Sequence, residues 1–176
     1  MIQKLTHDEI VKRQEHFRQT EKFPIRALLN NIRSLYNVGS MFRTADGAHL
    51  ERLYLSGITG SPPHPGIAKT ALGAEKSVSW QYVATPASIF TELRSEGVQI
   101  LVLEQTSDSV IYNEVPVRFP CCLVVGNEIS GVDSGVTYFA DYAIEIPMFG
   151  SKNSLNVAVA FGIVAYELVR KYRERL

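Results

Sequence analysis

The apolar run Phe119–Gly126, FPCCLVVG, constrains the fold more than any other stretch of the chain. Side chains alternate between the two faces of a strand, so a strand that is apolar throughout must be covered on both faces. Central strands of parallel sheets meet this condition, because helices pack on each side of them. The run therefore predicts an α/β fold, with a mostly parallel sheet and helices on both faces.

Other segments fit such a layered fold because expected strands and helices alternate along the chain. Further strands are expected at 25–31, 51–57, 78–84, 99–105 and 142–148. A capping box at Thr6–Glu9 predicts a first helix that reaches about Lys22. The remaining helices are expected at 37–50, 86–96, 132–139 and 154–176, and the Pro- and Gly-rich stretch 61–74 as a loop with at most one helical turn.

Composition limits the functions open to the chain. Its 176 residues are typical of one domain, and 18 basic against 18 acidic residues exclude binding of nucleic acid through bulk charge. Phosphate contacts would have to come from a local patch or from two subunits together. Cys121 and Cys122 would point to opposite faces of a strand, so we expect free thiols in a reducing compartment. Without a signal segment or membrane span, we expect a cytoplasmic protein.

The last expected helix contains the stretch Val157–Tyr166, VAVAFGIVAY, which is apolar on every side. A helix of this kind is expected to be buried all round. A chain of this length could achieve that at a subunit interface, or by wrapping the helix in its own loops.

Three polar loops follow expected strands, where open α/β sheets bind ligands. The first leads into NVGSMFRTAD, Asn37–Asp46, with Asn37 as a candidate N-cap and Gly39 leaving room for the Arg43 side chain. The alternative is a capped helix with an exposed arginine.

The second loop is VVGNEISGVD, Val124–Asp133, in which Gly126 would let a ligand approach the backbone next to Glu128. Its alternative is a tight turn with a solvated glutamate. In the third loop, Ser154 is expected to cap the last helix and Asn156 to lie in its first turn, where free N–H groups bind polar or anionic groups. Capping alone is the alternative there.

Together these loops offer a cation, a carboxylate, a hydroxyl and an amide, and none of these is a strong nucleophile. Such a set orients a polar substrate better than it forms a covalent intermediate. The sequence has no GxGxxG after the first strand, no P-loop and no GxSxG elbow. Its four histidines show no metal-ligand spacing, so no metal site is expected.

The three motifs NVGSMFRTAD, VVGNEISGVD and IPMFGSKNSLNVAVA (starting at Ile146) resemble those of SpoU-type RNA ribose 2′-O-methyltransferases of the SPOUT superfamily, the TrmH-like enzymes. They occur in the family order, and the resemblance covers about residues 25–170. It implies a domain at 25–176 preceded by an N-terminal helix at 1–24. It also implies a deep trefoil knot near the C-terminus, S-adenosyl-L-methionine as cofactor, and a homodimer whose partner and knot would enclose the last helix.

Site residues follow from the resemblance, position by position. The catalytic residues would be Asn37, Arg43, Glu128, Ser154 and Asn156. The cofactor-binding residues would be Leu103, Glu104, Gln105, Thr106, Gly126, Ile146, Met148, Ser154 and Leu155.

The implied reaction transfers a methyl group to a ribose 2′-hydroxyl of RNA. Because a guanidinium does not readily lose a proton, we interpret Arg43 as a clamp on phosphate and on developing negative charge, and we expect Glu128 to orient either Arg43 or Asn37. Small relatives often act on tRNA, which slightly favours tRNA over rRNA. Candidate phosphate contacts are Arg33, Arg43, Lys69, Lys76 and Lys152.

Three alternatives stay open at this point. An RNA base methyltransferase of the same fold would use the same cavity, although the Ser-Leu-Asn sequence at 154–156 favours the ribose branch. A non-catalytic RNA-binding SPOUT module would lack one of the site residues. An unrelated small-molecule enzyme would not bind S-adenosyl-L-methionine.

Overall fold

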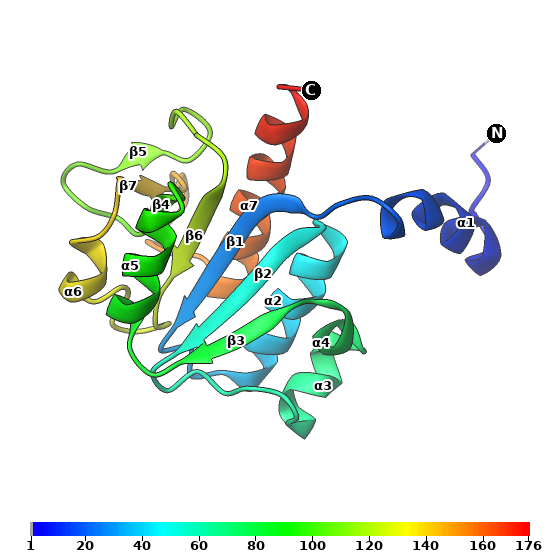
Figure 1. Ribbon diagram of the computed structural model, residues 1–176, viewed down its shortest axis with the longest axis horizontal. Helices are drawn as coiled ribbons and strands as arrows, with labels where there is room; N and C mark the ends of the chain where they lie inside the picture. The colour runs from blue at the N-terminus through cyan, green and yellow to red at the C-terminus, as the bar shows by residue number, and fades with distance from the viewer. Residues whose placement is uncertain (1) are drawn as a thin grey trace.

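The fold is built on a parallel seven-stranded sheet, seen in a computed structural model that describes residues 2–176. The strand order is β3-β2-β1-β6-β4-β7-β5, and every pairing is parallel (Figure 1). The strands are β1 (Phe23–Asn30), β2 (Leu50–Ser56), β3 (Trp80–Val83), β4 (Gln99–Leu103), β5 (Val110–Ile111), β6 (Cys121–Val125) and β7 (Tyr142–Glu145). The predicted α/β class is confirmed, and the six expected strands all occur. The two-residue β5 was missed because it is too short to show an alternating pattern.

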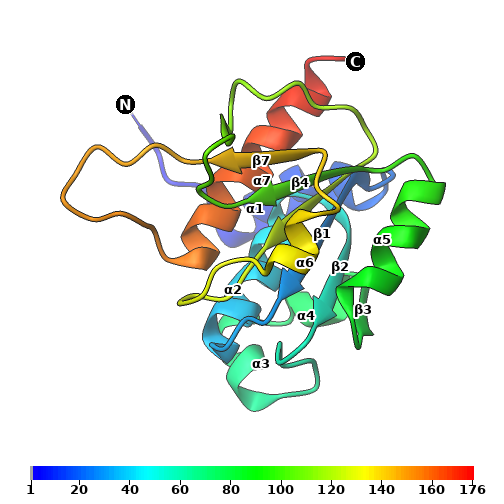
Figure 2. The same ribbon diagram turned by 90° about the vertical axis from the view of Figure 1, so that its left-hand side faces the viewer.

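Helices cover both faces of the sheet, as predicted (Figure 2). One face carries a core to which α2 contributes Phe42 and α7 contributes Phe161. A second core on the other face contains Phe90 of α5 and Val136 of α6. The helices are α1 (His7–Arg18), α2 (Leu35–Gly47), α3 (Pro65–Ala71), α4 (Ala74–Ser77), α5 (Pro86–Ser95), α6 (Ser134–Thr137) and α7 (Val157–Arg173).

Strand β6 lies in the middle of the sheet and is buried throughout. Cys121 packs in the core shared with α2 and α7, whereas Cys122 packs in the core shared with α5. Both cysteines are free, and burial raises the pKa of the Cys122 thiol to about 12. The predicted covering of this strand on both faces is therefore confirmed.

Helix α6 begins two residues later than expected, and the caps of α2 and α7 also differ from the prediction. The cap of α2 is Ser34, whose Oγ accepts a hydrogen bond from Asn37 N at 3.3 Å, so Asn37 lies inside the first turn. The cap of α7 is Asn156 rather than Ser154, because Asn156 Oδ1 accepts from the N–H groups of Ala158 and Val159. Ser and Asn are both good caps, so composition alone did not distinguish residues two or three positions apart.

The stretch 61–74, predicted as a loop, contains α3 and leads into α4. His64 caps α3 through a hydrogen bond from Gly66 N to its Nδ1 at 3.0 Å, and Pro65 occupies the first helical position. Proline is favoured at that position because its missing N–H would have no helical partner. The Pro and Gly content of this stretch therefore marks helix ends, which the loop interpretation overlooked.

The chain's own loops do not bury helix α7 all round, so that alternative is wrong, while burial at a subunit interface stays a prediction. Phe161 and Leu168 are fully buried, whereas Val159, Ile163 and Tyr166 are 52%, 37% and 54% exposed. The exposed residues recur at helical spacing and form one apolar stripe, named here the α7 stripe (Val159, Ile163 and Tyr166). Among residues 2–176, no helix, α7 included, is both long and apolar enough to cross a membrane.

Helix α1 projects away from the sheet (Figure 1). Its predicted capping box is confirmed, because Thr6 N donates to Glu9 Oε2 at 2.7 Å and Glu9 N donates to Thr6 Oγ1 at 3.4 Å. The helix ends at Arg18, four residues earlier than expected, and the chain becomes extended from Phe23 onward.

Candidate functional site

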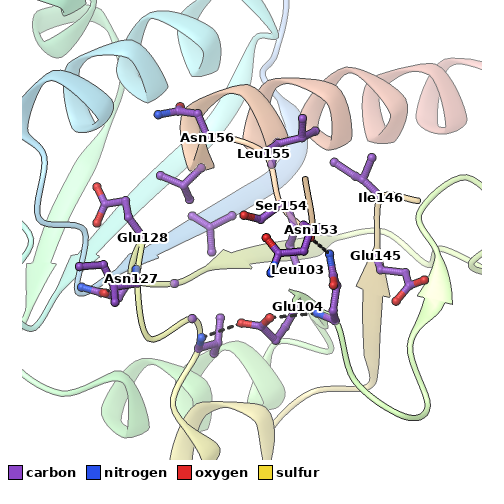
Figure 3. Close-up of a pocket in the computed structure, with 18 of the residues that line it drawn as sticks. Leu103, Glu104, Asn127, Glu128, Glu145, Ile146, Asn153, Ser154, Leu155 and Asn156 are labelled. Carbon is purple, nitrogen blue, oxygen red and sulfur yellow. Dashed lines mark hydrogen bonds between the residues drawn. The ribbon is translucent and has the colours of Figure 1, made fainter. Parts of the chain in front are cut away.

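The loops that follow β4, β6 and β7 surround a cavity of about 490 Å³ (Figure 3). This is the carboxyl edge of the sheet, where α/β proteins bind ligands. We name it the carboxyl-edge cavity. Its walls are Leu103–Gln105, Val125–Val132, Glu145, Ile146, Met148, Asn153–Val157 and Ala160.

The β6 loop is a closed turn with its own internal bonds. Asn127 and Gly131 exchange two backbone hydrogen bonds of 3.0 Å, and Gly131 has a φ of 70°, which favours glycine. A side chain on Gly126 would lie 2.5 Å from the carbonyl carbon of Gly131. Gly126 was expected to lack a side chain so that a ligand could approach, and this reason is wrong. Gly126 does line the cavity, but the room it leaves is filled by its own loop.

Glu104 ties this turn to the end of β4. Its carboxylate accepts hydrogen bonds from Val132 N at 2.9 Å and from Gln105 N at 3.0 Å. In turn, Gln105 Nε2 donates to Asn153 O in the β7 loop at 2.8 Å. Figure 3 shows these bonds as dashed lines along one side of the cavity. The three loops thus form one connected wall.

A second chain of hydrogen bonds connects the three motifs, and we name it the relay. Asn156 Nδ2 donates to Asn37 Oδ1 at 3.2 Å, and Asn37 Nδ2 donates to Glu128 Oε1 at 2.9 Å. Its direction is set at both ends. Asn156 Oδ1 is used to cap α7, so its Nδ2 must donate, and an ionised Glu128 can only accept. The motifs that the sequence analysis expected to meet do meet here.

Glu128 also anchors the start of α2. Its Oε2 accepts from Arg33 N at 2.9 Å, and its Oε1 accepts from Ser34 N at 3.1 Å. Partial burial disfavours the charged form, but the hydrogen bonds from Arg33, Asn37 and Ser34 outweigh it, so the pKa of the Glu128 carboxyl lies below its ordinary value. Glu128 therefore acts as a fixed anion that joins the β6 loop to α2.

Most of the predicted site residues lie around this cavity. Those that line it are Leu103, Glu104, Gln105, Gly126, Glu128, Ile146, Met148, Ser154, Leu155 and Asn156. Asn37 reaches it through the relay, whereas Thr106 is outside the lining and accepts a hydrogen bond from Asp108 N in the turn after β4. Glu145 and Asn153 also line the cavity but were missed, although Glu145 directly precedes the third motif and Asn153 lies inside it.

Arg43 lies elsewhere in the single chain. It borders a separate hollow of about 620 Å³ between α2, α3 and α7, named here the helix-face hollow and lined by Ser40, Arg43, Thr44, Gly47, Lys69, Thr70, Leu72 and Tyr166. Gly39 does not serve to make room for Arg43, which corrects that expectation. A side chain on Gly39 would overlap Thr70 Oγ1 and Ile67 O, so this glycine allows α2 and α3 to pack closely.

The two concave regions carry opposite charge. The carboxyl-edge cavity has three glutamates, Glu104, Glu128 and Glu145, and no Lys, Arg or His among its lining residues. The helix-face hollow has Arg43 and Lys69 and no Asp or Glu. The cavity is suited to a cationic ligand with an apolar part, and the hollow to an anion. Among residues 2–176, no three His, Cys, Asp or Glu side chains gather closely enough to hold a metal ion.

Sequence comparison places this arrangement among known proteins. Residues 24–166 match the SpoU rRNA Methylase family. The chain is 34% identical over 148 residues to the tRNA (guanosine(18)-2′-O)-methyltransferase of Aquifex aeolicus, covering 83% of this chain and 69% of the relative. It is 31% identical over 141 residues to the 23S rRNA (guanosine(2553)-2′-O)-methyltransferase RlmP of Bacillus subtilis, covering 80% of this chain and only 56% of that protein.

Solved structures agree with the sequence matches. The A. aeolicus TrmH/SpoU tRNA modifying enzyme superposes with a TM-score of 0.83 at 30% identity, covering 96% of this chain and 85% of the other. An AdoMet-bound rRNA methyltransferase from Sinorhizobium meliloti gives a TM-score of 0.79 at 28% identity, covering 84% and 56%. The family match spans most of the chain, and the three motifs that carry it surround one cavity. This chain belongs to the SpoU rRNA Methylase family.

Proposed function

We propose that this protein is an S-adenosyl-L-methionine-dependent RNA methyltransferase that acts on a ribose 2′-hydroxyl. The observation that carries the proposal is the charge contrast between two concave regions. The three motifs surround the cavity, and the first motif contributes Arg43 to the hollow. A cavity with three glutamates and no cation suits a methyl donor with a positive sulfonium, whereas a hollow with two cations and no acid suits RNA phosphate.

The carboxyl-edge cavity fits this cofactor in size and chemistry. Its volume of about 490 Å³ is ordinary for a small-molecule site. Leu103, Ile146, Met148 and Leu155 supply apolar surface for an adenine ring, and loop backbone supplies polar groups. When bound, the cofactor supplies a methyl group that is already activated for transfer, so the protein's task is mainly alignment.

In this proposal the relay holds the reacting groups in place. Asn156 and Asn37 are fixed by Glu128, so the first turns of α7 and α2 keep a constant separation beside the cavity. Ser154 makes no cap and lines the cavity, which leaves its hydroxyl available to the ribose. Arg43 cannot act as a base at neutral pH, and its role is to hold phosphate and stabilise negative charge on the 2′-oxygen.

We propose that a homodimer brings Arg43 to the reaction. Within one chain Arg43 and the cavity are separate, and Tyr166 of the α7 stripe lines the Arg43 hollow. A second copy that covers the apolar α7 stripe would therefore also lie against Arg43, and its own cavity would complete the site. The domain would comprise residues 25–176, with α1 as an N-terminal addition.

We also propose that the chain near the C-terminus forms a trefoil knot. Its support is topological. Strand β7 pairs with β4 and β5 on one side of β6, whereas α7 packs with α2 and contacts β1 and β6. The segment 146–156 has to connect these places, and Gln105 holds it against the β4 loop. Such a passage is what a knotted return of the chain requires.

The substrate in this proposal is RNA. We favour tRNA slightly over rRNA, because the relative named for tRNA is 34% identical and covered over 69% of its length, against 31% and 56% for the one named for rRNA. The test uses purified protein with methyl-labelled S-adenosyl-L-methionine and, separately, unmethylated transcripts of tRNA and of 23S rRNA. Digestion to nucleosides should place the label on a 2′-O-methyl ribose. Label on a base would support the base-methyltransferase alternative, and a protein that binds neither cofactor nor RNA would refute the proposal.

A further inference from the structure

An exposed aromatic ring and a lysine from different helices meet beside the helix-face hollow. Tyr36, in the first turn of α2, is 52% exposed, and Lys69 Nζ of α3 lies 5.4 Å from the centre of its ring. Ser40, one turn further along α2, already lines the hollow together with Lys69 and Arg43. The ring therefore continues the edge of the hollow toward the start of α2.

The pair is held on a rigid base. Thr70 Oγ1 of α3 donates to Tyr36 O at 2.9 Å, and Gly39 allows the two helices to approach so closely that any side chain at that position would overlap Thr70. The residue after Tyr36 is Asn37, which the relay fixes to Glu128 and Asn156. The position of Tyr36 at the edge of the hollow thus follows from packing against α3 on one side and from the relay on the other.

Neither cation of the hollow is neutralised by a carboxylate of the part of the chain that the structure describes. In residues 2–176, the ion pairs are formed by Arg26 and Arg170, and none involves Lys69 or Arg43. A second cation–ring pair, Arg94 over Phe139, differs from this one. Its ring stacks on Phe90 at 4.9 Å, and Arg94 also donates to Phe139 O, so both partners are occupied inside the fold.

We infer that Tyr36, Lys69 and Arg43 form a subsite for a nucleotide next to the methylated one, with its base stacked on Tyr36 and its phosphate held by the two cations. An accessible ring beside unpaired cations is the arrangement by which proteins hold single-stranded nucleic acid. Base stacking tolerates any sequence, so this subsite positions an unpaired stretch of RNA rather than reading its bases. The inference rests on the proposed function and adds to it the form of the substrate: single-stranded at the neighbouring nucleotide.

The test for stacking compares Tyr36→Ala with Tyr36→Phe in the full chain, with unmethylated tRNA and 23S rRNA transcripts as probes. Loss of one stacked base should raise the RNA KM about tenfold. Phenylalanine should restore it, because the ring is kept. Affinity for S-adenosyl-L-methionine, measured by calorimetry, should not change in either variant and reports that the protein is folded.

The test for the phosphate contact uses the salt dependence of RNA binding. One lost contact to a single strand lowers the slope of log K against log salt by about 0.7, which is the result expected for Lys69→Gln. Tyr36→Ala should leave the slope unchanged. Matched controls on the opposite face of the sheet are Arg94→Gln, which removes a cation from a ring, and Tyr138→Ala, which removes an exposed ring.

The outcomes separate this inference from the proposed function. A wild-type RNA KM in Tyr36→Ala, while the parent protein methylates RNA, would overturn the subsite alone. A change of oligomeric state in that variant would also overturn it, because Tyr36 would then contact a second copy rather than RNA. A parent protein that neither binds RNA nor accepts the methyl donor would overturn both.

Discussion

The carboxyl-edge cavity and the helix-face hollow differ in how their charged side chains are used. In the cavity, Glu104 and Glu128 are each bound by N–H groups of the chain, so their charges also fix the shape of the wall. In the hollow, Arg43 and Lys69 have no carboxylate partner in residues 2–176. A preformed wall suits a ligand of one shape, whereas cations without a carboxylate partner are suited to bind an anion such as RNA phosphate.

The largest expected effect separates the two regions by function. Arg43→Ala should lower the turnover number for RNA methylation about a hundredfold or more, since one donor to a developing oxyanion is worth that much. Its affinity for S-adenosyl-L-methionine should match that of the parent, because Arg43 does not line the cavity. Single-turnover methylation and calorimetry measure the two quantities. Methylation at the parental rate would remove Arg43 from the reaction.

The second prediction concerns the frame of the cavity. Glu128→Gln replaces an anion that accepts three hydrogen bonds, from Arg33 N, Ser34 N and Asn37 Nδ2. Hydrogen bonds to a charged group are worth more than neutral ones, so the free energy of unfolding should fall by about 2 kcal/mol. Urea unfolding measures this loss. The matched control is Glu15→Gln on α1, where the glutamate is exposed and makes no hydrogen bond within the described chain.

The same variant predicts a pH dependence with a definite sign. The pKa of Glu128 is lower in the folded than in the unfolded protein, so its charge stabilises the fold at pH values above the unfolded pKa. The stability difference between the parent and Glu128→Gln should be constant near neutral pH. It should shrink below about pH 4.5, as the carboxyl protonates in the folded state as well. A difference that grows on acidification would contradict the assigned role.

The β6 loop offers a test of glycine in the cavity wall. Gly131→Ala puts a side chain at a positive φ and against the Glu104 carboxylate. The backbone conformation alone costs about 1 to 2 kcal/mol for a residue with a Cβ. Distortion of the turn should weaken S-adenosyl-L-methionine binding about tenfold, as measured by calorimetry. Gly135→Ala is the control, because nothing lies within 4 Å of the added carbon. Equal affinities for S-adenosyl-L-methionine in the two variants would show that the β6 turn does not contribute to cofactor binding.

The sequence could predict a feature of this molecule where a residue pattern also indicated what packs against it. Apolar strands such as Cys121–Val125 need cover on both faces, so the layered fold could be predicted. Glycine signals close approach without identifying the neighbour, and at Gly39 and Gly126 the neighbour proved to be the chain itself. The apolar pattern of α7 indicated a need for cover, but the α7 stripe is exposed in one chain.

The sequence predicted which loops carry the candidate site residues, but it did not predict the contacts that these residues make. Asn37, Glu128 and Asn156 do converge, yet their relay depends on amide orientations that no spacing encodes. Arg43 follows Asn37 by six residues, which is about 1.7 turns of helix, so it lies on a different side of α2 and borders a different hollow. The position of a motif residue around its helix therefore decides which concave region it lines. The motif alone does not show this, so the sequence analysis placed Asn37 and Arg43 in one site.

The smallest expected effect concerns two polar residues between β7 and α7. The prediction is that Asn156 stabilises the cavity wall and that the Ser154 hydroxyl faces the cavity. Asn156→Ala removes the cap of α7 and the donor to Asn37, and loss of a helix cap costs about 1 kcal/mol. Ser154→Ala should leave the free energy of unfolding unchanged, because Ser154 caps nothing, while it lowers RNA turnover if its hydroxyl holds the ribose. Urea unfolding of both variants, with methylation assays alongside, distinguishes them. If Ser154→Ala were the destabilised variant, the cap assignment at Asn156 would be wrong, and the relay would lose its fixed direction.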